Sequence, residues 1–277
     1  MITLFVLMIY PIIYSYWISL HLYDLFQPQL GQPFIYADNY IYLLTNPSSK
    51  FWDSLRFTFI YVTGTITLSF LIGLGLALIL NEEFRGRNVI RSVLILPLVL
   101  TPVVVGFNFR FMYSETVGVI PFLLKSIGIP IKAILGDPVS AAIAVIAVDV
   151  WQWTPFILLI LLSGLQMIAR ENYEAAEIDG AASLEKFKYI TLPLLKPAIL
   201  IALIFRTLDA LKSFDAVFVI TGGGPGTATD LLTIEGYRIA FQYFQIGRGT
   251  AFAIIMALIS TIIAIIYLRI MREGGKK

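Results

Sequence analysis

The stretch ENYEAAEIDGAASLEKFKYITLPLLKP, residues 171–197, combines helical polar spacing with a glycine turn and lies between two apolar runs. Glu171, Glu174 and Glu177 recur every three residues, so they share roughly one face of a helix. Gly180 follows the last of these acids, where helices commonly end in a left-handed turn. The spacing therefore predicts a short helix with an acidic face that stops at a glycine.

The second half of this stretch predicts another short helix. Ser183 is a suitable N-cap, and Leu184 and Phe187 share a face at a spacing of three residues. Pro193 and Pro197 are expected to end this helix and to begin the next apolar run. The result is a compact knob of two helices, presented between two membrane spans.

Composition places the chain in the membrane class. Of its 277 residues, 58% are hydrophobic and 14% are charged, with a mean hydropathy of +0.84. An average soluble domain carries about 25% charged residues. A net charge of +2 without a clustered basic face gives no sign of nucleic-acid binding. With no cysteine and one histidine, thiolate and multi-histidine metal sites are excluded, and we expect no metal.

Six apolar runs have about the length needed to cross a bilayer. We therefore predict an all-α, polytopic membrane protein with one transmembrane domain over residues 1–277. The predicted spans cover about residues 2–20, 57–80, 93–113, 139–162, 198–220 and 250–271. A signal peptide is the alternative for the first run, but its start is uncharged and no small-residue cleavage site follows.

The distribution of Lys and Arg predicts the orientation. These residues are concentrated in loop 81–92, in loop 164–197 and after residue 268, while the longer opposite loops hold fewer. Cytoplasmic loops carry the excess of positive charge. Both termini and loop 164–197 are therefore expected on the cytoplasmic side of the cell (inner or plasma) membrane.

Several segments resemble one family of transporters. The triplet Glu174, Ala175 and Ala176, followed by Asp179 and Gly180, resembles the EAA loop of ABC importer permeases. The match is closest to the binding-protein-dependent sugar permeases, which include maltose and glycerol-phosphate permease subunits. It extends to Phe187, Ile190, Leu192, Pro193 and Pro197, to FIYADNY (34–40), to WQWTPF (151–156) and to Phe214-Asp215 before the glycine-rich loop.

The resemblance implies a permease subunit that forms the pathway for a carbohydrate, such as an oligosaccharide, a disaccharide or a related polyol or sugar phosphate. It implies two ATP-binding subunits, a second permease subunit in a heterodimer, and an extracellular solute-binding protein. The coupling residues would be Glu174, Ala175, Ala176, Asp179, Gly180, Phe187 and Pro193. The chain shows no nucleophile elbow and no histidine-based catalytic set, so we expect no enzyme activity and no cofactor, with ATP bound by the partner.

The fifth predicted span carries four charges of alternating sign at a spacing of three residues: Arg206, Asp209, Lys212 and Asp215. Each charge can pair with its neighbour along a helix. Two interpretations remain open, a polar lining for a hydrophilic solute and a buried ion-pair string that sets helix packing. An ion-coupled secondary transporter that uses this row is the alternative function; a scaffold or a membrane enzyme is a further alternative.

Two more segments are candidate contact sites. Asp149, Trp151 and Trp153 combine a carboxylate with aromatic faces, which suits an oriented sugar; a packing face is the alternative. The loop TGGGPGTAT (221–229) lacks the Lys of a phosphate-binding P-loop and is predicted to be a tight outside turn. By resemblance, Gly222, Gly223, Gly224 and Pro225 would face the solute-binding protein.

Overall fold

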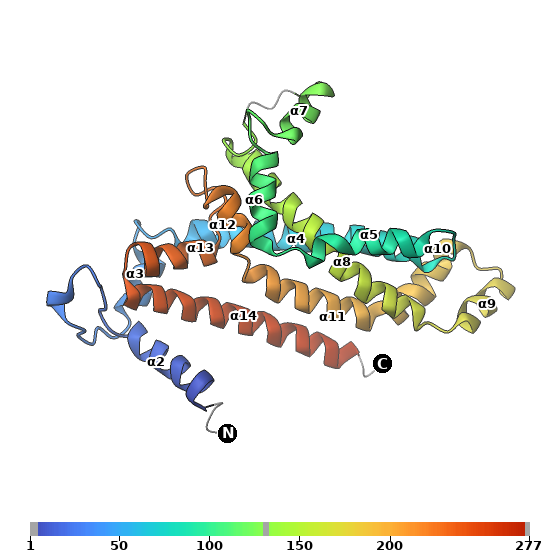
Figure 1. The fold of residues 1–277 in the computed structure, drawn as a ribbon. Helices are drawn as coiled ribbons and strands as arrows, with labels where there is room; N and C mark the ends of the chain where they lie inside the picture. The colour runs from blue at the N-terminus through green and yellow to red at the C-terminus, as the bar shows by residue number, and fades with distance from the viewer. Residues whose placement is uncertain (1–4, 130–132, 275–277) are drawn as a thin grey trace.

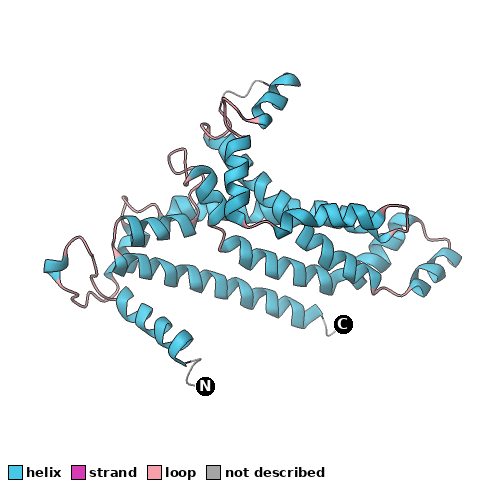
Figure 2. Ribbon diagram, viewed as in Figure 1, coloured by secondary structure: helices cyan, strands magenta, loops and turns pink. Residues whose placement is uncertain are grey.

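The computed structural model describes residues 5–129 and 133–274, which form a bundle of helices (Figures 1 and 2). Among these residues, extended pairing is limited to an isolated bridge between His21 and Phe34. The predicted all-α class is confirmed. Long apolar runs produce this outcome because a helix satisfies its backbone hydrogen bonds within one segment, as a bilayer requires.

Four helical stretches in the described part of the chain are long and apolar enough to cross a membrane. They are α4 (Phe51–Asn81), α8 (Pro138–Gln166), the continuous stretch Ser183–Leu211, and Ile246–Arg272 within α14 (Ile246–Gly274). The first predicted span begins in residues outside the described range and continues as η1 (Phe5–Ile9) and α2 (Tyr10–Ser19). The count of six spans therefore stays a prediction.

The third predicted span is sharply bent. It consists of α5 (Arg87–Val99) and α6 (Pro102–Met112), which meet at 96°. Leu100 and Thr101 between them are extended, and Thr101 precedes Pro102, a position at which the helical conformation is disfavoured. Helix α6 consequently turns away from α5, packs against α12 and α8, and places α7 (Val119–Ser126) at a projecting end of the molecule (Figure 1).

Helices α4 and α8 form the centre of the bundle. Ile157, Leu158, Leu161 and Leu162 of α8 are completely buried in a cluster that also includes residues of α4 and of the stretch Ser183–Leu211. A methyl group at Gly73 of α4 would lie 3.0 Å from Cγ2 of Ile157, so the glycine permits the close approach.

A second close approach gives a test of the packing. A methyl group at Gly164 of α8 would lie 2.6 Å from Cβ of Ala198 and 2.8 Å from Cδ1 of Leu195, whereas one at Gly75 of α4 meets nothing within 4 Å. We expect Gly164→Ala to lower the unfolding free energy by about 1–3 kcal/mol through overpacking. Gly75→Ala should leave it equal or raise it, since alanine is the better helix former. Thermal unfolding of both purified variants measures the two effects. Equal effects would contradict the close packing at Gly164.

Short helices cover the end of the bundle at which α4 begins. Here α3 (Asp38–Thr45), α13 (Leu232–Tyr237) and η4 (Arg238–Gln242) pack with the first turns of α14, and η2 (Pro28–Leu30) lies in the preceding loop. Their shared core comprises Leu43, Phe51, Leu232, Ile239, Ala251 and Phe252. The glycine-rich loop also lies at this end, while α9 (Arg170–Ile178) lies at the opposite end (Figure 1).

The fifth predicted span is not one helix. Helix α11 (Leu192–Leu211) ends before Lys212, and α12 (Asp215–Thr221) starts after Phe214. Phe214 has φ −144° and ψ −60°, far from helical geometry. Hydrogen bonds from distant parts of the chain hold Ser213 in the break, and neighbouring residues along the sequence give no sign of them.

Candidate functional site

The predicted two-helix knob is present at the end of the bundle marked by α9. Helix α9 is followed by Gly180 in the left-handed conformation, with φ +76°, and then by α10 (Ser183–Lys186). Glycine suits this turn because a side chain would strain the backbone at positive φ. Of the candidate coupling residues, Ala176 and Phe187 are half-buried, whereas the exposed ones are Glu174, Ala175, Asp179, Gly180 and Pro193.

Two local predictions for the knob were wrong. Ser183 is the first residue of α10 and caps nothing; instead the carboxylate of Glu185 accepts a hydrogen bond of 2.8 Å from the backbone N–H of Ala182. Pro193 and Pro197 do not end a helix, since helical structure continues from Ser183 to Leu211. The π-helical turn η3 (Phe187–Thr191) precedes Pro193, and such a turn accommodates the missing N–H and the ring.

Few contacts hold α9 to the other residues that the structure describes. The hydroxyls of Tyr173 and Thr191 lie 3.0 Å apart, and Lys186 Nζ lies 2.8 Å from Glu177 Oε1. Large apolar side chains around the knob project into solvent, with Met167 at 85%, Ile178 at 88% and Leu184 at 76% exposure. An apolar and acidic surface of this kind is suited to docking of another protein.

Within the bundle, Asp149 and Arg206 form a buried ion pair between α8 and α11. Arg206 is 1% exposed and Asp149 is 6% exposed, and one guanidinium nitrogen contacts Asp149 Oδ1. Arg206 Nη1 also lies 3.0 Å from Asp209 Oδ2. Tyr61 of α4 donates a hydrogen bond of 2.6 Å to Asp149 Oδ2. Three helices are thus joined by one polar network in an apolar interior.

The alternating row of four charges predicted along the fifth span is interrupted. Arg206 and Asp209 pair as neighbours, but the helix ends at Leu211, so Lys212 and Asp215 lie on the break and on α12. Among the described residues, neither Lys212 nor Asp215 takes part in an ion pair, and both are exposed. The described residues therefore give no continuous row of charges along one helix for an ion relay.

The two tryptophans of α8 have different surroundings. Trp153 is half-buried, and the guanidinium of Arg206 lies 5.5 Å from the centre of its ring. Trp151 is 42% exposed and packs edge-on against Phe109, with ring centres 5.2 Å apart. Trp151 thus offers an open aromatic surface, whereas Trp153 supports the buried cation.

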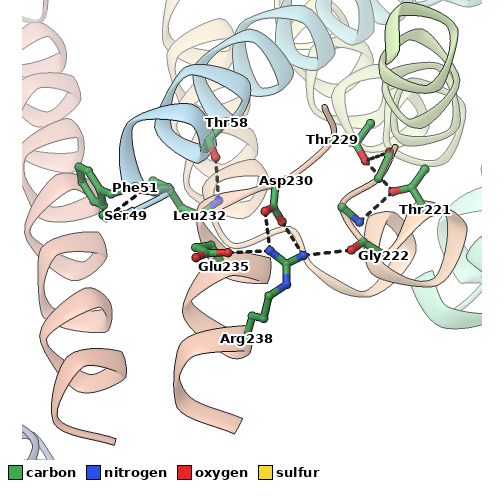
Figure 3. Close-up of polar contacts among 12 residues, drawn as sticks. Ser49, Phe51, Thr58, Thr221, Gly222, Thr229, Asp230, Leu232, Glu235 and Arg238 are labelled. Carbon is green, nitrogen blue, oxygen red and sulfur yellow. Dashed lines mark hydrogen bonds and ion pairs between the residues drawn. The ribbon is translucent and has the colours of Figure 1, made fainter. Parts of the chain in front are cut away.

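The glycine-rich loop rests on a buried polar cluster, shown in Figure 3. Arg238 reaches both carboxylate oxygens of Asp230, at 2.6 and 3.2 Å, and Glu235 Oε2 at 2.6 Å. Its Nη2 donates to the carbonyl of Gly222 at 3.2 Å. Asp230 is fully buried and packs so closely that a methyl group at Gly223 would lie 2.5 Å from its Oδ1. The cluster therefore sets the shape of the loop.

Hydroxyl groups complete this support. Thr229 Oγ1 donates to the carbonyl of Gly224 at 2.7 Å and lies 2.7 Å from Thr221 Oγ1 (Figure 3). Of the candidate contact residues, Gly222 is exposed, Gly224 and Pro225 are half-buried, and Gly223 is buried.

Asp230, Glu235 and Arg238 were not predicted as functional residues from the sequence. The available signal was the spacing of Glu235 and Arg238, three residues apart directly after a glycine-rich loop, which permits an ion pair on one helical face.

Burial changes the ionisation of this cluster. It raises the pKa of Asp230 above its ordinary value, and the hydrogen bond and charge of Arg238 oppose the rise only in part. Burial also raises the pKa of Glu235, and the neighbouring Asp230 carboxylate adds to the rise. Two acids share one guanidinium, so protonation of one acid relieves their repulsion.

These pKa shifts predict that the folding stability depends on pH. A carboxyl group with a raised pKa binds its proton more tightly in the folded state than in the unfolded state. Its stabilising contribution is present near the unfolded-state pKa of about 4 and is lost as the pH rises through the folded-state pKa. We therefore expect the stabilising contribution of Asp230 and Glu235 to grow as the pH falls towards about 4, and Glu235→Gln to weaken this dependence.

Thermal unfolding of the purified protein at several pH values checks this expectation. Glu115→Gln serves as the control, because Glu115 is exposed and lies outside the cluster. Identical pH profiles for the wild type and Glu235→Gln would contradict it.

Comparison with known proteins gives consistent matches. Residues 69–273 match the family described as "Binding-protein-dependent transport system inner membrane component". The chain is 39% identical to the trehalose/maltose transport system permease protein MalF of Thermococcus litoralis, with 96% of this chain and 89% of the relative covered. It is 35% identical to the sulfoquinovosyl glycerol transport system permease protein SmoG of Agrobacterium fabrum, with 98% of this chain and 87% of the relative covered.

A solved structure has a similar fold. It is a bacterial ABC transporter involved in the import of the acidic polysaccharide alginate, with a TM-score of 0.84 and 23% sequence identity. The match covers 98% of this chain and 92% of the other.

Proposed function

This chain belongs to the family of binding-protein-dependent transport system inner membrane components, and from this premise we propose that it forms the pathway of an ATP-driven carbohydrate importer. Two separate ATP-binding subunits, a second permease subunit in a heterodimer and an extracellular solute-binding protein complete the proposed assembly. ATP hydrolysis takes place on the ATP-binding subunits. Both termini and α9 lie on the cytoplasmic side, as the distribution of Lys and Arg supports.

The observation that carries the proposal is the knob at α9. Its acidic and apolar side chains are exposed and its contacts with the bundle are few, although large exposed apolar side chains are costly in water. Docking of an ATP-binding subunit would cover Ile178 and Leu184, which flank the turn at Gly180.

The connections of the knob suit the transmission of movement. Helix α9 follows α8 after three residues, and α10 continues without interruption into α11. The Asp149–Arg206 pair then joins α8 to α11 inside the bundle. Closure of the ATP-binding subunits would move both helices together and alter access to the pathway.

Polar and aromatic groups support a hydrophilic solute. Trp151 is open to ring stacking, and Asp209, Lys212 and Asp215 are exposed near the break in the fifth span. Carboxylates and ammonium groups hydrogen-bond sugar hydroxyls, so we assign these four residues to the substrate pathway. Arg206, which pairs with Asp149 and lies over Trp153, holds Asp209 from the buried side. The loop at Gly222 to Pro225 is the proposed contact for the solute-binding protein.

Uptake into proteoliposomes tests the proposal. The reconstituted complex with its ATP-binding subunits and loaded binding protein should accumulate a radiolabelled carbohydrate from a panel only when ATP is enclosed. An ionophore that collapses ion gradients should leave uptake unchanged. Uptake that needs an ion gradient and no ATP would identify a secondary transporter instead.

A further inference from the structure

Ser213 occupies the break between α11 and α12 and bonds to two distant segments. Its carbonyl accepts a hydrogen bond from Thr233 Oγ1 of α13, and its hydroxyl lies 2.9 Å from the hydroxyl of Tyr61 on α4. A carbonyl released from a helix inside an apolar bundle needs a partner, because leaving it unpaired costs about 1–3 kcal/mol. Thr233 provides that partner.

The direction of the hydrogen bonds follows from the number of protons. Tyr61 has one hydroxyl proton and donates it to Asp149 Oδ2 at 2.6 Å. The Ser213 hydroxyl must therefore donate to Tyr61. The chain of hydrogen bonds therefore runs from Ser213 through Tyr61 to Asp149. The other carboxylate oxygen of Asp149 faces Arg206. Bonds that all point towards one charged acceptor strengthen one another.

At Ser213, this chain of hydrogen bonds is connected to the residues that hold the glycine-rich loop. Thr233 lies on α13, the same helix as Glu235, and Arg238 follows directly after it. Arg238 holds the carbonyl of Gly222, and the backbone N–H of Leu232 donates to Thr58 of α4 at 2.9 Å (Figure 3). A displacement of the loop would therefore move α13, and with it the carbonyl of Ser213.

We propose that Ser213 and Thr233 are positioning residues that couple the glycine-rich loop to the buried Asp149–Arg206 pair. An event on the outer surface, such as docking of a loaded binding protein, changes the alignment of α13. Ser213 passes this change to Tyr61 and so to the pair between α8 and α11. The proposal rests on the proposed function as an ATP-driven importer.

The experiment measures ATP hydrolysis by the complete complex in nanodiscs, with and without the solute-loaded binding protein. Ser213→Ala and Thr233→Val should lower the ratio of stimulated to basal hydrolysis at least about fivefold, with the basal rate within twofold of wild type. The double variant should be no worse than either single variant, because both act on one chain of bonds. Thr233→Ser keeps the hydroxyl and should retain the ratio.

Two controls replace hydroxyls whose hydrogen bonds, within the part of the chain that the structure describes, stay in their own helix. Ser163 Oγ donates to Leu159 at 2.8 Å and Thr261 Oγ1 donates to Ala257 at 2.8 Å, and both residues are away from the break. Ser163→Ala and Thr261→Val should keep the wild-type ratio.

Three outcomes would overturn the proposal: an unchanged ratio in Ser213→Ala and Thr233→Val, basal and stimulated rates that fall equally, or a ratio lost in Thr233→Ser as well. A wild-type complex that is never stimulated by a binding protein would instead count against the proposed function.

Discussion

Replacement of Arg206 by methionine is expected to lower the unfolding free energy by about 3–5 kcal/mol, the usual cost of leaving a buried charge without its partner. Asp149 is 6% exposed, and of its side-chain contacts with residues 5–129 and 133–274 the hydrogen bond from Tyr61 would remain in Arg206→Met. Its carboxylate would then be held in an apolar interior without a cation. Thermal unfolding of the purified complex and ATP-driven uptake are the two measurements, and both should decline.

The double variant Asp149→Asn/Arg206→Met distinguishes the loss of a pair from the loss of one side chain. An asparagine still accepts the hydrogen bond from Tyr61 and carries no charge, so most of the lost stability should return. Arg170→Met is the matched control for thermal unfolding, because Arg170 pairs with Glu174 at 3.2 Å on the surface with 89% of its side chain exposed. A double variant no more stable than Arg206→Met would contradict the explanation.

The largest expected effect on assembly is that of Gly180→Asp. We expect the affinity for the ATP-binding subunit to fall at least about 100-fold, equivalent to about 2.7 kcal/mol. An aspartate at φ +76° strains the turn and adds charge and volume to an open surface, since nothing lies within 4 Å of the added methyl position. Co-purification and direct binding of the ATP-binding subunit measure the loss. Glu174→Lys, on the same surface, should act in the same direction.

Gly128→Asp is the control for backbone strain. Gly128 also has positive φ, at +82°, and open space around it, but it follows the projecting helix α7, far from α9. This variant should bind the ATP-binding subunit as the wild type does. If Gly180→Asp also retained binding and ATP-driven uptake, the coupling role of the knob would be wrong.

The outline of the fold could be predicted because its causes are local. Apolar runs of about 20 residues favour membrane helices, and the contact at Gly73 follows from a small residue on a helix face. The knob could be predicted for the same reason, since Gly180 ends α9 by its own conformational freedom. The details at Ser183 and Pro193 could not, because Glu185 competes for the cap and a π-helical turn accommodates the proline.

The candidate site could be predicted only in part. Arg206 was expected to pair with neighbours along one helix, and it pairs with Asp209 as well as with Asp149, which is 57 positions away in the chain. Asp230 and Arg238 required the folded loop to bring them together around the carbonyl of Gly222.

The sequence by itself determined the membrane class, the helical architecture and the acidic knob at its surface, since hydropathy, spacing and glycine act over a few residues. Only the tertiary structure decided where the fifth span breaks and which charges are paired. Ser213 leaves the helix because Thr233 and Tyr61, 20 and 152 positions away, take its carbonyl and its hydroxyl. Hydrogen bonds of such long range depend on how helices pack, and packing is a property of the whole bundle.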